Sequence, residues 1–288
     1  MAVGGMFLDR PGAPPLFVRR VGPAAGHPPR AHLLLVHASM VHSEYYLPLA
    51  SELASADIDV WIPDLRGHGR SGGIPGHLGH WRQHVADVAD AFAAMCRGST
   101  VGAPLLLAGE SYGGLMVYLA CQSRLVDPAA TLLLSPALGL TLQVSARQRW
   151  WLRHVGRPLL SRMRPVRPLG HAGIAADPYI GRLIDADRQT SRHYTLGFLA
   201  ALLEAVEAAH TAPPRAAPPI LALLSAGDPV CDNAAAERLL RRHPAAIVKV
   251  LSGPQHSLVA DLPEAVATEM LAWVRRWAPG PVCAQVRS

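Results

Sequence analysis

The stretch LLLAGESYGGLMVYLA, residues 105–120, decides the fold, because an apolar run breaks on Gly-Glu-Ser-Tyr-Gly and then resumes. The first apolar run is typical of a buried parallel strand, and the second is apolar enough to open a buried helix. Ser111 is therefore predicted to lie on a strand-to-helix turn. We expect a Cβ at Gly109 or Gly113 to collide across this turn. The turn would hold the Ser111 hydroxyl clear of the sheet, beside the free N–H groups of a helix amino end.

Further strands and helices alternate along the chain around this turn. The alternation predicts an α/β protein with a mostly parallel sheet covered by helices on both faces. A looser pattern at 16–21 predicts an edge strand. Buried strands are expected at 32–38, 58–64 and 104–108, and further strands at 131–137, 219–226 and 246–252. Helices are expected at 45–56, after Trp81, after Ser111, and at 233–241 and 263–277.

The alternation is interrupted between residue 137 and about residue 215, where the pattern is helical throughout. We expect a single domain overall, with an α/β core formed by 1–136 and 213–288. The helical segment 137–212 is predicted to be a cap inserted in this core. It would lie over the carboxyl end of the sheet, where ligands bind in open α/β folds.

The composition favours a reduced, cytoplasmic protein with a large core. Half of the residues are hydrophobic, no apolar stretch is long enough for a membrane span, and MAVGGMFLDR lacks the pattern of a signal peptide. The four cysteines are scattered without a CxxC pair, which argues against a disulfide framework. The formal charge of +6 gives no reason to expect a nucleic-acid partner, and the oligomeric state stays open.

A serine becomes a nucleophile when a base accepts its proton and a carboxylate orients that base. Asp228 follows the predicted strand 219–226, and His256 follows the next one, so the order Ser, Asp, His fits a strand–turn–helix serine. Asp232 is the competitor for Asp228, but we expect it to cap the following helix. Asp261 is expected to begin the last helix, ahead of Pro263.

An acyl-transfer site also needs N–H groups that stabilise an oxyanion. We expect one from the backbone of Tyr112, directly after the nucleophile. The second is expected from the backbone of Ser39, in the loop after LLLVHA.

With these motifs the chain resembles an α/β-hydrolase of the monoacylglycerol lipase and lysophospholipase branch, which is similar to serine aminopeptidases of the S33 type. The resemblance covers nearly the whole chain and implies an acyl-enzyme mechanism with Ser111 as nucleophile, His256 as base and Asp228 as orienter. It implies neither a metal nor an organic cofactor. The family usually has His-Gly where this chain has His37-Ala38, and alanine should fit if its φ is negative. The matching segments are LLLVHASMVHSEYY, DLRGHGRSGG, GESYGG, LLSPAL, ADPYIGR, SAGDPVCD and GPQHSLVADLPE.

Three other sequence features are interpreted as structural, without a role in binding or catalysis. GHGRSG at 67–72 imitates a dinucleotide fingerprint, but no helix follows it, so we expect a structural turn in which Asp64 and Arg66 bond neighbouring loops. His77, His80 and His84 have a spacing that metal ligands use, yet solvated histidines at a helix start are favoured. Cys231 is interpreted as a small buried hydrophobe, with a reactive thiol near the site as the alternative.

The predicted cap carries the clue to the substrate. Between Asp127 and Asp177 there is no acidic residue, while arginines alternate with tryptophans and leucines, which suits contact with anionic lipid. The alternative is a solvated cationic surface whose apolar side covers the sheet. The residues expected to face substrate or membrane are Arg149, Trp150, Trp151 and Arg153.

Together these features predict a serine hydrolase of carboxylic esters, with a monoacylglycerol or lysophospholipid as the lipid ester substrate. A thioesterase, an acyltransferase, a small-ester carboxylesterase and a serine aminopeptidase remain alternatives on the same triad. A binding module without turnover is disfavoured, because a binder has no need of all three residues. The acyl chain length and the head group stay open.

Overall fold

The structure is a computed structural model, and it describes residues 1–39, 41–164, 182, 184–190, 193–211, 218–253 and 255–277. Much of the second half of the predicted cap therefore lies outside the described residues. The same holds for Arg167, one of the cap arginines between Asp127 and Asp177, and for the segment ADPYIGR, apart from Arg182.

The described residues form an eight-stranded sheet in the order β1-β2-β4-β3-β5-β6-β7-β8. β2 runs antiparallel to β1 and to β4, and every other neighbouring pair is parallel. The predicted α/β class with a mostly parallel sheet is confirmed. The strands are β1 (Ala2–Leu8), β2 (Leu16–Gly22), β3 (Ala31–Val36), β4 (Ile58–Pro63), β5 (Leu105–Glu110), β6 (Ala130–Leu134), β7 (Ile220–Ser225) and β8 (Ala246–Leu251).

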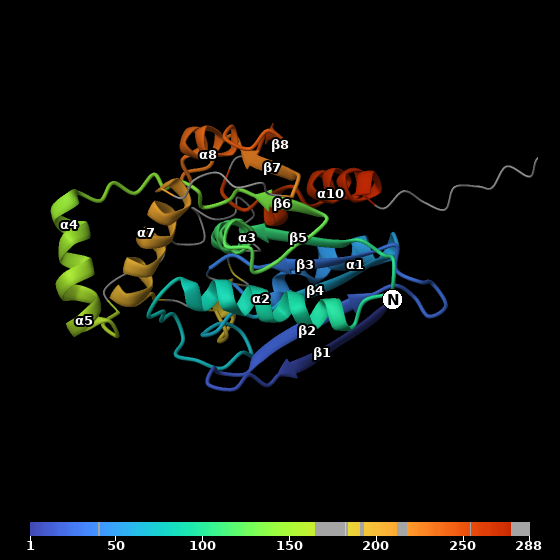
Figure 1. Ribbon diagram of the computed structural model, residues 1–288, viewed down its shortest axis with the longest axis horizontal. Coiled ribbons are helices and arrows are strands. Elements are labelled where there is room, and N and C mark those ends of the chain that lie inside the picture. The colour runs from blue at the N-terminus through green and yellow to red at the C-terminus, as the bar shows by residue number, and fades with distance from the viewer. Residues whose placement is uncertain are drawn as a thin grey trace, which may run out of the picture.

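The sheet is buried on both faces by two separate apolar clusters. Successive side chains of a strand point to opposite faces, so Leu34 and Val36 of β3 belong to one cluster and Leu33 and Leu35 to the other. The first cluster includes side chains of α2 (Arg82–Arg97), α3 (Tyr112–Gln122) and α8 (Asn233–Leu240). The second includes side chains of α1 (Leu47–Ser55) and α10 (Pro263–Trp277). Figure 1 shows the resulting three layers.

Three local expectations were wrong. The strand at 16–21 is not an edge strand, because β1 pairs along its whole length and takes the edge position. β1 escaped detection because its side chains are mostly exposed and include two adjacent glycines. The expected helix at 45–56 begins only at Leu47, because its first two residues belong to a 3-10 turn, η1 (Ser43–Tyr46). Asp261 ends a short helix, α9 (Leu258–Asp261), instead of beginning the last helix.

The helices between β6 and β7 lie beyond one end of the sheet. Figure 1 shows α4, α5 and α7 beside the end toward which the arrow of β7 points, which is the carboxyl end of the parallel strands. In the part of the chain that the structure describes, no helix is long and apolar enough to cross a membrane. The elements are α4 (Ala146–Trp151), the π-helical turn η2 (Leu152–Gly156), α5 (Arg157–Leu160) and α7 (Leu196–Thr211).

Candidate active site

Ser111 lies on a strained turn between β5 and α3. Its backbone has φ 53° and ψ −117°, a conformation that residues with a side chain rarely adopt. A Cβ at Gly109 would lie 2.6 Å from the backbone of Gly113, so the predicted collision across the turn occurs there. A Cβ at Gly113 would instead meet the carbonyl oxygens of Val36 and His37, at the end of β3. Glycine is therefore required both by the turn and by the neighbouring strand.

Loops from two later strands bring His256 and Asp228 to this serine. His256 Nε2 lies 2.6 Å from Ser111 Oγ, and His256 Nδ1 lies 2.8 Å from Asp228 Oδ2. A carboxylate only accepts hydrogen bonds, so Nδ1 carries the proton and Nε2 is free to accept one from the serine. All three side chains are buried or nearly so. This arrangement can activate a hydroxyl for nucleophilic attack.

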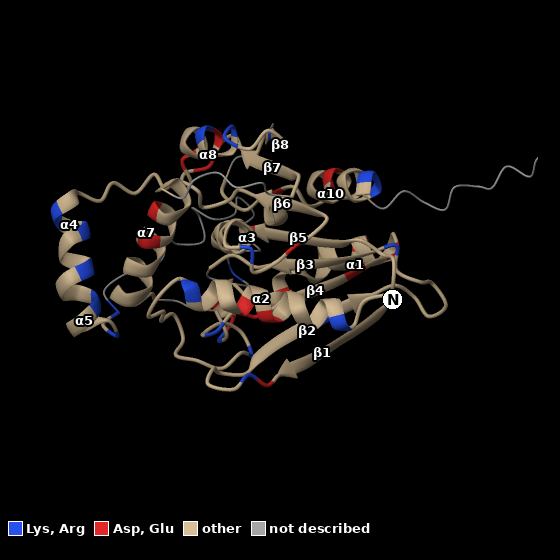
Figure 2. Cartoon of the chain, viewed as in Figure 1, with Lys and Arg blue, Asp and Glu red and all other residues tan. Residues whose placement is uncertain are grey.

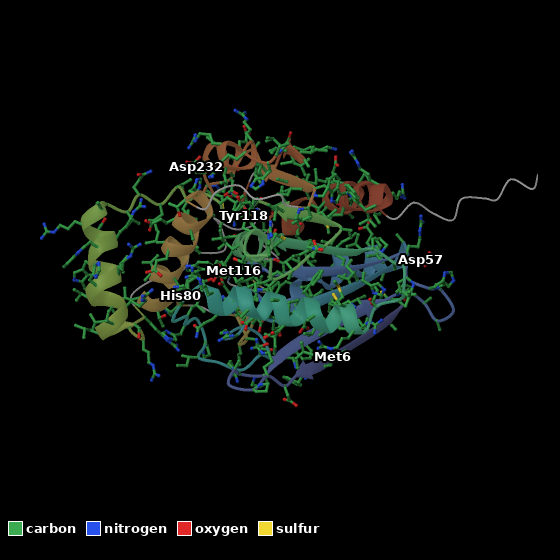
Figure 3. All side chains as sticks on the ribbon, viewed as in Figure 1. Met6, Asp57, His80, Met116, Tyr118 and Asp232 are labelled. Carbon is green, nitrogen blue, oxygen red and sulfur yellow. The ribbon has the colours of Figure 1, made fainter. Side chains whose placement is uncertain are left out.

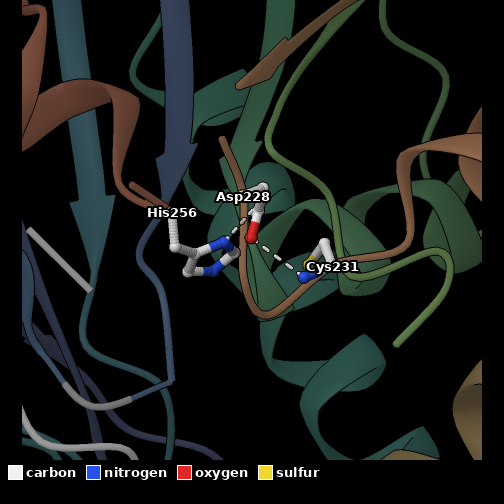
Figure 4. A group of neighbouring side chains, drawn as sticks. All are labelled: Asp228, Cys231 and His256. Atoms are coloured by element: carbon white, nitrogen blue, oxygen red, sulfur yellow. Dashed lines mark hydrogen bonds and ion pairs between the residues drawn. The ribbon is translucent and has the colours of Figure 1, made fainter. Parts of the chain in front are cut away.

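Asp228 is itself fixed by the turn that follows β7. Its second oxygen, Oδ1, accepts hydrogen bonds from the backbone N–H groups of Val230 at 2.8 Å and Cys231 at 2.9 Å (Figure 4). The competitor Asp232 lies at the start of α8 (Figure 3), where its side chain accepts from the backbone N–H of Ala235. Asp232 therefore caps the helix, as its position in the sequence predicted.

The surroundings shift the pKa of the His256 imidazole in two opposed ways. Burial lowers this pKa, but the sulfur of Cys231 and the hydrogen bond and charge of Asp228 raise it, and the net pKa lies above the usual 6.5. Burial raises the pKa of the Cys231 thiol, so the sulfur is uncharged at neutral pH. Of the two groups that raise the pKa of His256, Asp228 is therefore the one that carries a charge at neutral pH and stabilises the imidazolium.

Asp228, Cys231 and His256 also form the one group of possible metal ligands found among the described residues, with ligand atoms within 4.8 Å of one another. Both carboxylate oxygens and both ring nitrogens already have hydrogen-bonding partners. A metal ion would have to break the contacts between Asp228, His256 and Ser111. The donor set therefore fits an acid–base site better than a metal centre.

The residues predicted to supply the oxyanion N–H groups lie on either side of the turn. Tyr112 is the first residue of α3, so its N–H has no acceptor within the helix. On the other side, the backbone N–H of Leu65 donates to His37 Nε2 at 3.0 Å, which leaves the proton on Nδ1. His37 Nδ1 then donates to the Ala38 carbonyl at 2.6 Å, and this carbonyl belongs to the same peptide group as the Ser39 N–H. Ala38 is not among the residues with positive φ, so alanine fits this loop.

A cluster of buried histidines lies behind this loop and was not predicted. His68 Nε2 lies 2.5 Å from the Ser39 carbonyl, and His84 lies between the Tyr112 hydroxyl at 2.8 Å and the Arg66 carbonyl at 3.1 Å. Burial lowers the pKa of both rings, that of His84 to about 3. The expectation of solvated histidines is wrong for His84, because α2 turns it toward α3. Its position three residues after Trp81 and four before Val88, two residues of the apolar helix face, was the available signal.

The GHGRSG segment forms the predicted structural turn. Asp64 accepts from the backbone N–H groups of Ser43 at 2.7 Å and Arg70 at 2.8 Å, which ties together two loops. Arg66 instead pairs with Asp87 of α2 at 2.5 Å. Cys231 is 3 % exposed, so it packs as a small buried residue.

The predicted substrate- or membrane-facing residues lie on the outer helices. Trp150 and Trp151 are 60 % and 40 % exposed, although the next residue, Leu152, is buried. Two of the arginines have their charge paired with a carboxylate, although no acidic residue is near them in the sequence. Arg153 pairs with Glu207 at 2.7 Å, and Arg157 pairs with Glu204 at 2.6 Å. Arg153 belongs to η2 and Arg157 to α5. Figure 2 shows basic residues along the segment from α4 to α5 and acidic residues on α7.

Comparisons with known proteins identify the family to which the sequence is similar. Residues 27–263 match the model of the family described as serine aminopeptidase, S33. The chain is 27 % identical to the monoglyceride lipase of Homo sapiens over 258 residues, which cover 85 % of this chain and 82 % of the human protein. A comparable match, also 27 % identical, is the monoglyceride lipase of Rattus norvegicus, with 86 % of this chain and 82 % of the rat protein covered.

Solved structures agree on the fold. The monoacylglycerol lipase of Paleococcus ferrophilus superimposes with a TM-score of 0.79 at 21 % identity, covering 91 % of this chain and 99 % of that one. A soluble variant of the monoglyceride lipase from Saccharomyces cerevisiae, in complex with a substrate analog, superimposes with a TM-score of 0.77 at 16 % identity, covering 96 % and 95 %. The predicted α/β-hydrolase fold is thereby confirmed.

Proposed function

The chain belongs to the serine aminopeptidase S33 family of α/β-hydrolases and is an ester hydrolase, and from this premise we propose that Ser111, His256 and Asp228 cleave a monoacylglycerol. The observation that carries the proposal is the continuous chain of contacts from Ser111 Oγ through His256 to Asp228, at 2.6 and 2.8 Å. The naming of the curated relatives supports the glycerol ester as substrate.

The proposed reaction follows the transfer of a proton from Ser111 to His256 and then to the leaving group. His256 Nε2 takes the proton of Ser111 as Oγ bonds to the ester carbonyl carbon, and the imidazolium formed is stabilised by Asp228. The backbone N–H groups of Ser39 and Tyr112 would receive the oxyanion. His256 then protonates the departing glycerol oxygen, leaving an acyl group on Ser111. Water, deprotonated by His256, releases the fatty acid and restores the serine.

The same proposal includes peripheral contact with an anionic membrane through α4 and its neighbours. A lipase substrate is dispersed in a membrane or interface, and the exposed indole rings of Trp150 and Trp151 are suited to that boundary. Arg149 lies on the same helix, and its Nε donates a hydrogen bond to the backbone carbonyl of Val144. A carbonyl is uncharged, so this bond leaves the positive charge of Arg149 in place. The charge for lipid attraction would come mainly from such arginines, since Arg153 and Arg157 are paired.

A substrate panel tests the proposed function. Purified protein is given monoacylglycerols, lysophospholipids, acyl-CoA, p-nitrophenyl butyrate and an aminoacyl p-nitroanilide, with Ser111→Ala as the matched control. We expect the highest kcat/KM on a monoacylglycerol and no turnover by the Ser111→Ala variant. Preference for acyl-CoA would indicate a thioesterase, and preference for the anilide an aminopeptidase. Either preference would contradict the proposal.

A further inference from the structure

A buried carboxylate directly precedes the proposed nucleophile. Glu110 is the last residue of β5 and is 2 % exposed. Its Oε2 accepts a hydrogen bond from the Tyr46 hydroxyl at 2.5 Å. Its Oε1 accepts from the Ser257 hydroxyl at 2.9 Å and from the backbone N–H of Val259 at 3.3 Å. These three partners are all neutral donors, so the carboxylate depends on hydrogen bonds for its burial.

The direction of each hydroxyl bond is fixed by a second contact. The Tyr46 oxygen accepts from the backbone N–H of Ala38 at 2.9 Å, so its proton points to Glu110. Burial and the nearby Glu110 raise the pKa of Tyr46 well above its usual value, which keeps this proton in place. The Ser257 oxygen likewise accepts from the backbone N–H of Ala260 at 3.3 Å, so its proton also points to Glu110.

These two chains of hydrogen bonds end on the two loops that the reaction needs. Ala38 precedes Ser39, whose N–H is a proposed oxyanion donor, and we call residues 37–39 the oxyanion loop. Ser257 follows His256, the proposed base, and we call residues 255–257 the base loop. Glu110 itself adjoins Ser111. One carboxylate therefore contacts both loops from the strand that carries the nucleophile.

We propose that Glu110 is a positioning residue whose carboxylate holds the oxyanion loop and the base loop in register with Ser111. The inference rests on the proposed function of this site and adds to it a group that does not touch the substrate. Displacement of catalytic groups by about 1 Å can lower a rate about 100-fold, so a fixed frame of this kind has a measurable effect on kcat.

The test removes the carboxylate and its donors separately. Glu110→Gln, Tyr46→Phe and Ser257→Ala are each assayed with p-nitrophenyl butyrate, and the rate of fluorophosphonate labelling of Ser111 is followed in parallel. We expect kcat and the labelling rate to fall about 10- to 100-fold while KM stays unchanged. In the Glu110→Gln background, Tyr46→Phe should lower kcat far less than it does alone, because both changes act through one carboxylate. If Glu110→Gln fails to fold, the other two variants still carry the test.

Two matched controls separate positioning from general stability. Asp59→Asn removes a fully buried carboxylate that accepts from His32, Trp61 and Arg20 at the amino end of β4, far from Ser111 along the parallel strands. Tyr118→Phe removes a buried hydroxyl that bonds His243 at 2.8 Å, on α3 (Figure 3). Both should lower the melting temperature without changing kcat.

The possible results are distinguishable. An unchanged kcat in Glu110→Gln, or an equal loss of kcat in the controls, overturns the inference and leaves the proposed function intact. So does a loss in the Tyr46→Phe variant that multiplies fully with that of Glu110→Gln. A wild-type protein that neither hydrolyses any ester nor reacts with the fluorophosphonate overturns the proposed function, and the inference with it.

Discussion

At the scale of single residues, the choice between two nearby carboxylates determines the chemistry of the site. Asp228 and Asp232 are four positions apart, yet one accepts from His256 and the other from the first turn of α8. The difference arises because Asp228 lies at the end of β7, beside the loop that follows β8. Of the two carboxylates, Asp228 is therefore the one that contacts the imidazole.

Replacing each carboxylate by its amide separates the two roles. Asp228→Asn should lower kcat about 10⁴-fold, because an amide no longer stabilises the required tautomer and the imidazolium. Asp232→Asn should leave kcat and stability nearly unchanged, because asparagine caps a helix as well as aspartate does. Steady-state assays and thermal melts of the two variants check this. A reversed pattern would show that Asp232 is the orienter.

The raised pKa of His256 gives activity and stability opposite dependences on pH. The base must be neutral to accept the serine proton, so activity should rise as pH increases through its folded-state pKa, above 6.5. The same raised pKa stabilises the fold below pH 6.5, and this stabilisation is lost as pH rises through the folded-state pKa. An NMR titration of the imidazole resonances measures the midpoint directly. We expect it above 6.5 in the wild type and lower in Asp228→Asn; equal midpoints would contradict the assignment to Asp228.

At the scale of elements, α2 supports the site from behind. His84 of α2 holds the Tyr112 hydroxyl and the Arg66 carbonyl, while Asp87, one turn further, pairs with Arg66. One helix face thereby fixes both the first residue of α3 and the loop after β4. Neutral His84 is part of this contact, because burial lowers its pKa to about 3.

This buried histidine should make the fold sensitive to acid. The unfolded chain takes up a proton at His84 near pH 6.5, whereas the folded chain does so only near pH 3, so stability is lost as pH falls between these values. His84→Gln keeps an amide that can bond the same partners and does not titrate. Between pH 6.5 and 5.5 the wild type should lose about 1 kcal/mol more unfolding free energy than this variant. Urea unfolding of both proteins at both pH values measures this difference. Equal losses of unfolding free energy would show that His84 is not held neutral.

Elements with a strong apolar pattern could be predicted from the sequence, and those defined by distant contacts could not. The helix at 263–277 was predicted with the bounds observed, because its apolar residues repeat at helical spacing. β1 and α9 were missed, since one is exposed and glycine-rich and the other has only four residues. The contact of Tyr46 with Glu110 joins positions 64 apart, and no local pattern announces it. Arg153 and Glu207 are 54 positions apart, so their ion pair could not be predicted from the segment around Arg153 either.

At the scale of the whole molecule, α4, α5 and α7 extend the protein beyond the carboxyl end of the sheet (Figure 1). Their outer surface combines exposed apolar side chains with arginines, while ion pairs join η2 and α5 to α7. This is the part of the described molecule that we propose for contact with lipid.

Vesicle sedimentation tests that contact. Trp150→Ala should weaken binding to neutral and anionic vesicles alike, because it removes exposed apolar area from the interface. Arg149→Gln should lower only the anionic component, by about 1 kcal/mol at low salt, and this effect should fade as salt is added. Arg153→Gln is the matched control, with a smaller effect, since its charge is already paired. Binding of the wild type that ignores both lipid charge and salt would contradict the proposed membrane contact.

The central claim is that Ser111 forms an acyl-enzyme with the help of His256 and Asp228. The most direct measurement is intact-protein and peptide mass spectrometry after rapid acid quenching of the enzyme with a monoacylglycerol. We predict a transient mass increase equal to the acyl group, located on the peptide that contains Ser111. The increase should be absent in Ser111→Ala and greatly slowed in His256→Ala. Turnover of the monoacylglycerol by Ser111→Ala, or an acyl group on any other residue, would contradict the account.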